Sequence, residues 1–436
     1  MAVMGGIIGS GIFLGPQVVA QRVGSARLTL TAWVLGGVIA LAGALCFAEL
    51  GARRPRAGGG YVYLREAFGP LPAFLYGWTL LLVIATGAIA AVAVTFASYT
   101  VSLLGLAPDA AVPLAIGAIV LLSGVNYVGV KPAAITQNIF TVLKLLALAV
   151  LIVAGLLAAP SAVLGRPGPS GAVPVGWVAL GTALGSALVP VLFAFGGWQQ
   201  TNFVAEEIVA PEKNLPRALI LGVAGVIAAY LLANVAYLRT LGAAGLAASA
   251  APAADAMERA LGVPGRTLIS AGIAVSTFGF LNLVILVSPR VYQAMGADGV
   301  FFPGFARLHP EYRTPGVAIV FQELWAIVLV MTGTYGQLLD YVVFGDWIFF
   351  GLTAATLFVD RSRDRSGQGS PGFRVPAYPW IPALFILGAL YVVASSIAVN
   401  PGNALRGGGL IALGVPVYAF WRPRLMGEVG RGKGEG

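Results

Sequence analysis

Two apolar segments of the chain are interrupted by glycines in a way that suits the binding of a small polar solute. Residues 5–13 read GGIIGSGIF and residues 193–198 read FAFGGW. A helix that unwinds inside a membrane frees backbone N–H and C=O groups that lipid cannot satisfy, so such a break is tolerated where it lines a polar cavity. For either segment alone, close helix packing is the better interpretation. The pair, at corresponding places in two halves of the chain, favours a transporter.

The composition indicates that the elements carrying these segments lie in a membrane. Of the 436 residues, 58% are hydrophobic and 10% are charged, and the mean hydropathy is +0.89. Apolar stretches of about 20 residues, long enough to cross a hydrocarbon core as helices, recur almost throughout. We predict an all-α integral membrane protein with twelve transmembrane helices. Their expected starts are Ala2, Leu30, Leu71, Val112, Ala134, Trp177, Arg217, Pro264, Gly316, Leu338, Tyr378 and Leu405.

The predicted spans form two groups of five, followed by two more. Each group opens with a glycine-broken span, and because five is odd, the second group is inverted relative to the first. Inverted repeats place the broken helices together at the bilayer midplane, where helix N-termini face an anion and free carbonyls face a cation, as an amino acid zwitterion requires. We expect the repeats in residues 1–158 and 176–360, two extra helices in 376–422 and a cytoplasmic tail in 423–436.

The first broken span is short on its N-terminal side. About seven residues precede the break, which gives roughly 10 Å of helix where half a bilayer needs roughly 15 Å. Either the first half-helix is shortened or the true start lies upstream of Met1, and we expect the latter. No small-residue cleavage signature follows this segment, so we expect it to be retained.

The positive charges fit a membrane topology better than a nucleic-acid interface. The formal net charge is +9, but Lys and Arg are scattered over short loops rather than gathered on one face. With the N-terminus inside, the inner loops and tail hold 18 basic residues and the outer loops hold seven, and Lys144 completes the total of 26. The positive-inside rule then predicts a multi-pass protein of the inner cell membrane with both termini cytoplasmic.

Three further motifs carry a family resemblance. Residues 137–148 read QNIFTVLKLLAL, residues 202–207 read NFVAEE and residues 214–216 read NLP. Together with the two glycine motifs, they resemble the amino acid–polyamine–organocation superfamily, and within it the L-type amino acid transporters and their prokaryotic relatives. The resemblance runs through nearly the whole chain, including residues 276–299 and 372–421, and implies a leucine-transporter-type fold.

The resemblance implies that the two breaks together bind the backbone groups of an amino acid. In the first break, N–H groups at Ser10 and Gly11 would face the substrate carboxylate, and the carbonyl of Ile7 would face the ammonium group. In the second, the carbonyls of Phe193 and Ala194 would complete the ammonium site. The aromatic ring of Phe193 would act as the gate that closes over bound substrate.

The expected side-chain pocket is small-walled and uncharged. Gly196 and Gly197 would leave room for the substrate side chain, and a bulkier residue at Gly196 would narrow the accepted range. No carboxylate is expected around these glycines, Gln199 and Asn282, which favours neutral over cationic substrates. Asn282 could hydrogen-bond either the substrate or a neighbouring backbone, and both alternatives stay open.

Lys144 is the only lysine inside a predicted span. An unpaired ammonium there costs several kcal/mol unless it meets carbonyls, hydroxyls or water, and its place midway along the span disfavours snorkelling to an interface. The resemblance places it against the first broken helix, near Ser276 and Thr277, where sodium-driven relatives of this architecture hold Na⁺. The fixed ammonium would replace that ion. The lysine could also carry a proton, so exchange and proton coupling both stay open.

The acidic residues allow several interpretations. Glu49, Glu206 and Glu207 lie near the basic loop that follows Arg53, as an inner gate of ion pairs or as a solvated cluster. Three acidic residues in or beside the ninth and tenth spans receive no role: Glu323, Asp340 and Asp346.

We therefore predict a sodium-independent secondary transporter of neutral L-amino acids, with no cofactor and no metal. A cationic amino acid or polyamine antiporter of the same superfamily is the alternative. A membrane-embedded enzyme is disfavoured, because His309 lies in a loop, Cys46 stands alone and no paired acidic motif falls mid-span. No filter repeat supports a pore.

The resemblance also bears on partners. Animal L-type transporters are tethered by a disulfide to a single-span glycoprotein through a cysteine in an external loop. The corresponding residues 105–111 contain no cysteine. We therefore expect no obligatory disulfide-linked subunit, and the sequence leaves the oligomeric state open.

Overall fold

The structure, a computed structural model, describes residues 2–159, 176–332, 335–364 and 372–432, and all the regular elements in these ranges are helices. Nine helical segments in the described chain are long and apolar enough to cross a membrane. They are Ala26–Arg53, Pro70–Leu104, Pro108–Val128, Ile135–Leu157, Trp177–Glu207, Pro211–Ala248, Val263–Ala297, Tyr341–Arg363 and Trp380–Val399.

The helices are labelled in chain order. The α-helices are α1 (Ala2–Ile7), α2 (Gly11–Val23), α3 (Ala26–Arg53), α4 (Gly60–Phe68), α5 (Pro70–Thr79), α6 (Ala85–Leu104), α7 (Ala111–Val128), α8 (Val130–Leu157), α9 (Trp177–Phe195), α10 (Pro211–Ala248), α11 (Pro252–Leu261), α12 (Val263–Ala297), α13 (Gly316–Thr332), α14 (Tyr335–Arg363), α15 (Trp380–Val399) and α16 (Pro401–Gly432). The other helical turns are η1 (Leu80–Ile84), η2 (Pro108–Ala110), η3 (Trp198–Glu207) and η4 (Pro303–Ala306).

The outer helices present apolar side chains outward. Val120, Leu146, Leu324 and Leu387, from four different helices, are 57–64% exposed. Contiguous exposed apolar surface of this kind is unfavourable in water and suits contact with lipid tails. The described chain is thus an all-helical, multi-pass membrane protein, as the composition predicts.

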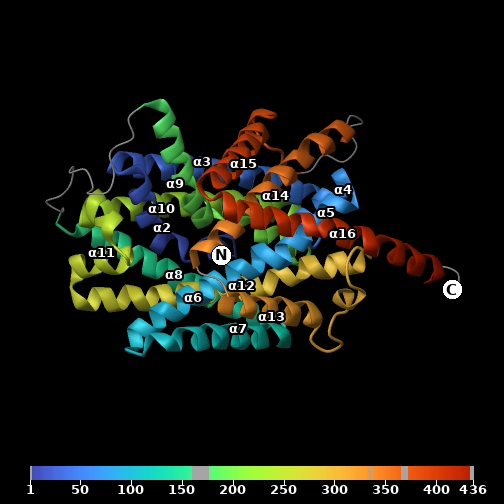
Figure 1. Cartoon of the computed structure of the whole chain (residues 1–436), viewed down its shortest axis with the longest axis horizontal. Helices are drawn as coiled ribbons and strands as arrows, with labels where there is room; N and C mark the ends of the chain where they lie inside the picture. Colours follow the sequence, from blue (N-terminus) through green and yellow to red (C-terminus); the bar gives the residue numbers. More distant parts are fainter. Residues whose placement is uncertain (1, 160–175, 333–334, 365–371, 433–436) are drawn as a thin grey trace.

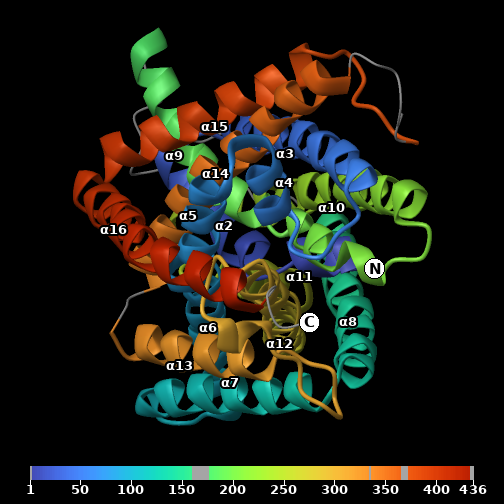
Figure 2. The ribbon, with the colours of Figure 1, turned by 90° about the vertical axis from the view of Figure 1, so that its right-hand side faces the viewer.

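The long helices pack around a short helix in the interior. Figure 1 shows α6, α7, α12 and α13 running along the long axis, and these four helices contact one another pairwise. Figures 1 and 2 both show α7 and α13 on the face opposite α15, with α2 between them. The glycine-broken segment that ends in α2 is therefore surrounded by protein and not by lipid.

Both glycine-containing segments are interrupted in the structure. Helix α1 ends at Ile7 and α2 begins at Gly11, whereas α9 ends at Phe195 and gives way to the 3₁₀ turn η3. Gly197 adopts φ +103°, a conformation that side chains with a Cβ rarely adopt. A Cβ at Gly197 would lie 2.1 Å from the carbonyl oxygen of Gly6. The two breaks are therefore in direct contact.

Three local features differ from the predicted spans. The helix that begins at Pro70 contains a π-helical turn, η1, before it continues as α6. Helix α11 lies in a segment that was expected to be a loop. It buries Ala253 and Met257 on one face, but it is too short to be recognised as a span from hydropathy. Helix α13 has only 17 residues. Hydropathy detects long apolar runs, so it does not report such short or irregular elements.

Candidate functional site

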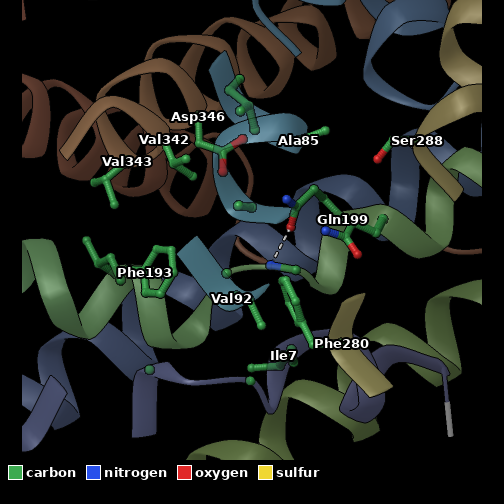
Figure 3. A pocket seen from close by; sticks show the side chains of 18 of the residues that line it. Ile7, Ala85, Val92, Phe193, Gln199, Phe280, Ser288, Val342, Val343 and Asp346 are labelled. Atoms are coloured by element: carbon green, nitrogen blue, oxygen red, sulfur yellow. Dashed lines mark hydrogen bonds between the residues drawn. The ribbon is translucent and has the colours of Figure 1, made fainter. Parts of the chain in front are cut away.

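A cavity lies where the two broken segments meet. Six of the residues predicted to bind substrate line it: Ile7, Ser10, Gly11, Phe193, Gly196 and Gly197. Figure 3 shows the ring of Phe193 on one side of this cavity and Ile7 at its base. Apolar side chains from η1, α6 and α14, such as Ile84, Ala85, Val342 and Val343, form much of the remaining wall.

The first break presents unsatisfied N–H groups to this cavity. No described residue accepts a hydrogen bond from the backbone N–H of Gly9, Ser10 or Gly11. The Ser10 hydroxyl is buried, does not cap α2 and has no partner in the described chain. The start of a helix carries a partial positive charge, so this group of donors suits an anion such as a carboxylate.

Side chains of three helices bind the carbonyl groups of the same break. The Lys144 ammonium donates to the oxygens of Gly5 at 2.9 Å and Ile8 at 2.8 Å. The Ser276 hydroxyl lies 3.5 Å from the Ile8 oxygen, and the Tyr230 hydroxyl donates to the Ile7 oxygen at 3.1 Å. A carbonyl oxygen has two lone pairs, so the Ile7 carbonyl can accept a second donor.

Thr277 does not take part in this arrangement through its hydroxyl. That group donates to carbonyl oxygens of its own helix, at Ile273 and Ala274, over 2.8 Å and 3.0 Å. Of the three residues expected at the ion-site position, Lys144 and Ser276 therefore contact the break directly. Lys144 is completely buried.

The second break is held by a side chain of its own segment. The Gly197 N–H donates to Gln199 Oε1 at 2.9 Å, the dashed line in Figure 3. The Gly196 N–H donates to the Phe193 carbonyl at 3.1 Å. Ala194 differs from expectation, because it lies behind the cavity wall: a Cβ at Gly11 would lie 2.6 Å from its Cα. Ala194 thus packs α9 against α2.

Asn282 also lies outside the cavity lining. It accepts a hydrogen bond from Asn126 Nδ2 at 3.0 Å and donates to Gln137 Oε1 at 3.4 Å. All three side chains are buried, and together they join α7, α8 and α12. In this structure Asn282 therefore contacts neighbouring side chains and does not line the cavity, although it was expected at the substrate site. The rotation of a helix that is apolar all round cannot be read from its sequence, so the direction of this side chain was not predictable.

One carboxylate does line the cavity, contrary to the sequence-based expectation. Asp346 of α14 lies one turn after Val342, and Figure 3 shows its carboxylate directed into the cavity on the side opposite Ile7. The expectation that this pocket contains no carboxylate, on which the prediction of neutral substrates depends, is therefore wrong. The sequence contained a signal, since Asp346 is an acidic residue within a predicted span, but nothing in it showed which way the side chain pointed.

An aromatic layer separates the cavity from one end of the bundle. Trp198 packs against Phe47 and Phe350, with ring centroids 4.9 Å and 5.6 Å apart. Phe350 also lines the cavity. Aromatic pairs at these separations are favourable beyond their burial of apolar area. The layer closes the cavity toward the end of α3 that carries Glu49.

Ion pairs lie beyond this aromatic layer. Glu49 is completely buried and pairs with Arg53 at 2.8 Å and Arg361 at 2.5 Å, and it accepts the N–H of Val375 at 2.7 Å. Glu207 pairs with Arg290 at 2.6 Å. Of the two alternatives left open for Glu49, the structure has ion pairs and not a solvated cluster.

A second group of charges lies beside Glu49. Arg54 binds Asp360 through two hydrogen bonds of 2.5 Å and 2.8 Å and pairs with Glu66. Burial lowers the pKa of the Arg54 guanidinium, but the hydrogen bond and the charge of Asp360 outweigh it and hold that pKa above its usual value. Arg54 therefore stays charged, and three segments of the chain remain joined at this end.

These features define a class of protein. Helices that cross a membrane and surround a small cavity between two interrupted segments are typical of secondary transporters. Residues 1–420 match the family model described as amino acid permease. The chain belongs to this family, within the amino acid–polyamine–organocation superfamily.

Individual relatives cover most of the chain. The serine/threonine exchanger SteT of Bacillus subtilis (strain 168) is 32% identical over 429 residues, which are 97% of this chain and 95% of SteT. The b(0,+)-type amino acid transporter 1 of Mus musculus is 33% identical, over 92% of this chain and 81% of its own. The large neutral amino acids transporter small subunit 2 of Mus musculus is 34% identical, over 96% and 80%. The family and the names of these relatives are those of amino acid permeases, transporters and exchangers.

Proposed function

We propose that the chain carries neutral L-amino acids across the inner cell membrane without sodium, by alternating access, either as an exchanger or with protons. One observation supports this most directly. Ser10 and Gly11, whose N–H groups have no acceptor among the described residues, and Ile7, whose carbonyl can accept a second donor, line a single cavity. An amino acid zwitterion supplies the carboxylate and the ammonium that these two sets of groups require.

Sodium independence rests on Lys144. Its ammonium already donates to the carbonyl oxygens of Gly5 and Ile8, the kind of oxygen ligands that a sodium ion would need. A fixed positive charge at that position repels a second cation. It also supplies the electrostatic attraction to the carbonyl oxygens of the break that a sodium ion would supply. The transporter therefore needs no metal ion there.

We also propose the twelve-helix arrangement and the repeat. The nine long apolar segments, the α1–α2 pair, α13 and α16 together account for twelve crossings. Residues 1–158 would form the first repeat and residues 176–360 the inverted second one, with residues 376–422 as two added helices and 423–436 as the tail. The 18 inner and seven outer basic residues support cytoplasmic termini.

The choice between neutral and cationic substrates depends on Asp346. Much of the cavity wall is apolar, which favours neutral side chains, and the names of two relatives specify large neutral amino acids and serine or threonine. An ionised Asp346 would instead favour the cationic alternative. Neutral substrates are compatible with this carboxyl group when it carries a proton.

We further propose that the transporter works without a disulfide-linked subunit. Residues 105–111 contain no cysteine, and the single cysteine of the chain, Cys46, is completely buried. A disulfide to another chain requires a thiol that the partner can reach.

Reconstitution in liposomes tests the proposed function. Vesicles preloaded with unlabelled leucine should take up radiolabelled leucine with saturation, and the rate should be the same in sodium and choline buffers. Competition by serine, leucine, phenylalanine and lysine then defines the substrate class. Absence of saturable countertransport for every amino acid tested would refute the proposal.

A further inference from the structure

The carboxylate of Asp346 has no hydrogen-bond or ion-pair partner among the described residues. No described residue donates a hydrogen bond to it or forms an ion pair with it, although it lies among the packed helices and is exposed only in part. Figure 3 shows it at the edge of the cavity, between Val342 and Ala85. An ionised carboxylate without a counter-ion is costly at membrane depth, so this group needs a proton or a cation.

Three cations of the described helices and their ends are already bound to other groups. Lys144 binds the carbonyls of Gly5 and Ile8, Arg361 binds Glu49, and Arg54 binds Asp360. These arginine pairs lie beyond the aromatic layer, at the end of α14 that contains Asp360. None of these cations compensates the charge of Asp346.

The helices packed against α14 offer no cation to Asp346 either. Tyr76 of α5 is the titratable side chain that interacts electrostatically with Asp346. Helix α9 and the turn η1 contain no ionisable residue. In α3, Arg27 is exposed at the N-terminal end, whereas Glu49 and Arg53 lie in the ion pairs described above, which also include Glu66 of α4. In α4, Tyr61 and Arg65 bind Asp298, and Tyr63 accepts a hydrogen bond from Asn202. The others on neighbouring helices have different surroundings: Tyr99 lines a separate pocket, Tyr391 donates to Gly181, Tyr418 packs on Phe74 and Arg406 is exposed.

The surroundings of Asp346 favour a proton over a substrate cation. A substrate ammonium brings three N–H donors, each of which needs an acceptor once it leaves water. On either side of Asp346, Figure 3 shows Val342 and Ala85, whose side chains accept no hydrogen bond. A protonated carboxyl group is neutral and needs only one acceptor, which a nearby amide such as that of Gln199 or a water molecule can supply.

We propose that Asp346 is the proton-binding residue of the transport cycle, so that one proton on its carboxyl group enters with each neutral amino acid. This proposal rests on the proposed function, and of the two modes named there, exchange and proton-linked transport, it selects proton-linked transport. The proton comes from water on the outer side, forms one O–H bond with the carboxylate and returns to water on the inner side. Because the amino acid is a zwitterion, each cycle moves one positive charge inward.

This assigns different tasks to Lys144 and Asp346. Lys144 holds the first broken segment in place through its hydrogen bonds to the carbonyl groups of Gly5 and Ile8. Asp346 changes its charge and makes the loaded and empty cavities differ by one proton. An outside solution that is more acidic than the inside then favours the inward movement of the loaded carrier.

The test uses full-length protein in liposomes that contain a trapped pH-sensitive dye. Adding external leucine should acidify the lumen of wild-type vesicles, and an inward gradient of one pH unit should support up to about tenfold accumulation, the ratio that one proton per substrate allows. Asp346→Asn should lose both the acidification and the gradient-driven accumulation. Leucine counterflow at equal pH, even if slower, shows that this variant is folded and binds substrate.

Glu323→Gln is the matched control. Glu323 is also buried in a membrane helix, but one of its carboxylate oxygens accepts a hydrogen bond from Gln322, and it does not line the cavity. Its variant should keep the proton signal and the accumulation ratio of wild type. Loss of the proton signal in Glu323→Gln with its retention in Asp346→Asn would overturn the proposal.

Other outcomes separate this proposal from the function on which it rests. Wild-type counterflow without any proton entry would refute the role of Asp346 and leave the proposed transport intact, whereas absence of all counterflow would refute the transport itself. Lysine uptake that disappears in Asp346→Asn while proton entry persists would make Asp346 a substrate-cation site. If Asp346→Asn shows no counterflow, Asp346→Glu decides: counterflow with proton entry supports the proposal, and counterflow without it refutes it.

Discussion

The ammonium nitrogen of Lys144 lies 2.8 Å from the carbonyl oxygen of Ile8, between the end of α1 and the start of α2. The same nitrogen binds Gly5 at 2.9 Å. The lysine thus supplies the hydrogen bonds that the interrupted helix has lost on its carbonyl side. On the amide side of the break, the free N–H groups of Ser10 and Gly11 remain available to a ligand.

Replacing Lys144 with Ala should abolish most transport. The substitution leaves the buried carbonyls of Gly5 and Ile8 without this donor, at about 1–3 kcal/mol for each unsatisfied group. We expect the rate of leucine counterflow to fall at least about tenfold, which corresponds to 1.4 kcal/mol. Lys213→Ala, at an exposed position before the seventh predicted span, is the control and should match wild type. Full activity of Lys144→Ala would contradict the role assigned to this side chain.

Transport should be insensitive to sodium. The initial rate of leucine uptake at fixed pH should agree, within error, between vesicles in sodium chloride and in choline chloride, because the Lys144 ammonium occupies the position where a cation would stabilise the break. A rate that rises with sodium concentration and saturates would show a metal site that the proposal lacks.

A methyl group at Gly197 should disrupt the contact between the two breaks. Its Cβ would lie 2.1 Å from the Gly6 oxygen, and its φ of +103° adds strain of about 1–3 kcal/mol for a non-glycine residue. Gly197→Ala should lower the midpoint of thermal unfolding in detergent and lose counterflow. Gly117→Ala, on α7 with no atom within 4 Å of its added Cβ, should unfold at the wild-type temperature or higher. Equal unfolding temperatures for the two variants would contradict the close approach of Gly197 to the Gly6 carbonyl.

Glycine at position 196 should set the range of substrates. Its φ of −67° tolerates a side chain, and an added Cβ would lie 3.2 Å from the Phe193 carbonyl oxygen at the cavity wall. Gly196→Val should therefore raise the KM for leucine and phenylalanine several-fold more than the KM for alanine, because the larger side chains need the volume that valine fills. A uniform change in KM for small and large substrates would argue that Gly196 serves folding and not selectivity.

Neutralising Glu49 should destabilise the protein. This buried carboxylate binds Arg53 and Arg361, and breaking a buried ion pair by removing one charge costs about 3–5 kcal/mol. Glu49→Gln should clearly lower the midpoint of thermal unfolding. Glu258→Gln provides the comparison, because its pair with Arg266 is exposed, with 39% and 46% of the two side chains accessible, and contributes about 1 kcal/mol or less. A smaller effect at Glu49 than at Glu258 would contradict this ranking.

The positions of the breaks could be predicted because glycine has a specific physical effect on a membrane helix. Runs of apolar residues located the spans, and the same glycines located the cavity. The directions of Ala194, Asn282 and Asp346 could not be predicted, since helices in lipid are apolar on the faces that meet protein as well as on those that meet lipid, and their rotation leaves no periodic signal. The π-helical turn η1, which contributes Leu80 and Ile84 to the cavity, has no sequence signature either.

Cys46 is the only sulfhydryl of the chain, and it is completely shielded by its neighbours. Maleimide reagents should therefore leave the native protein unmodified. A cysteine introduced at any chosen depth, for example beside the aromatic layer or at the mouth of the cavity, would be the sole point of attachment for a dye or spin label. The native sequence is thus already a background in which the opening and closing of each side can be followed without first removing residues.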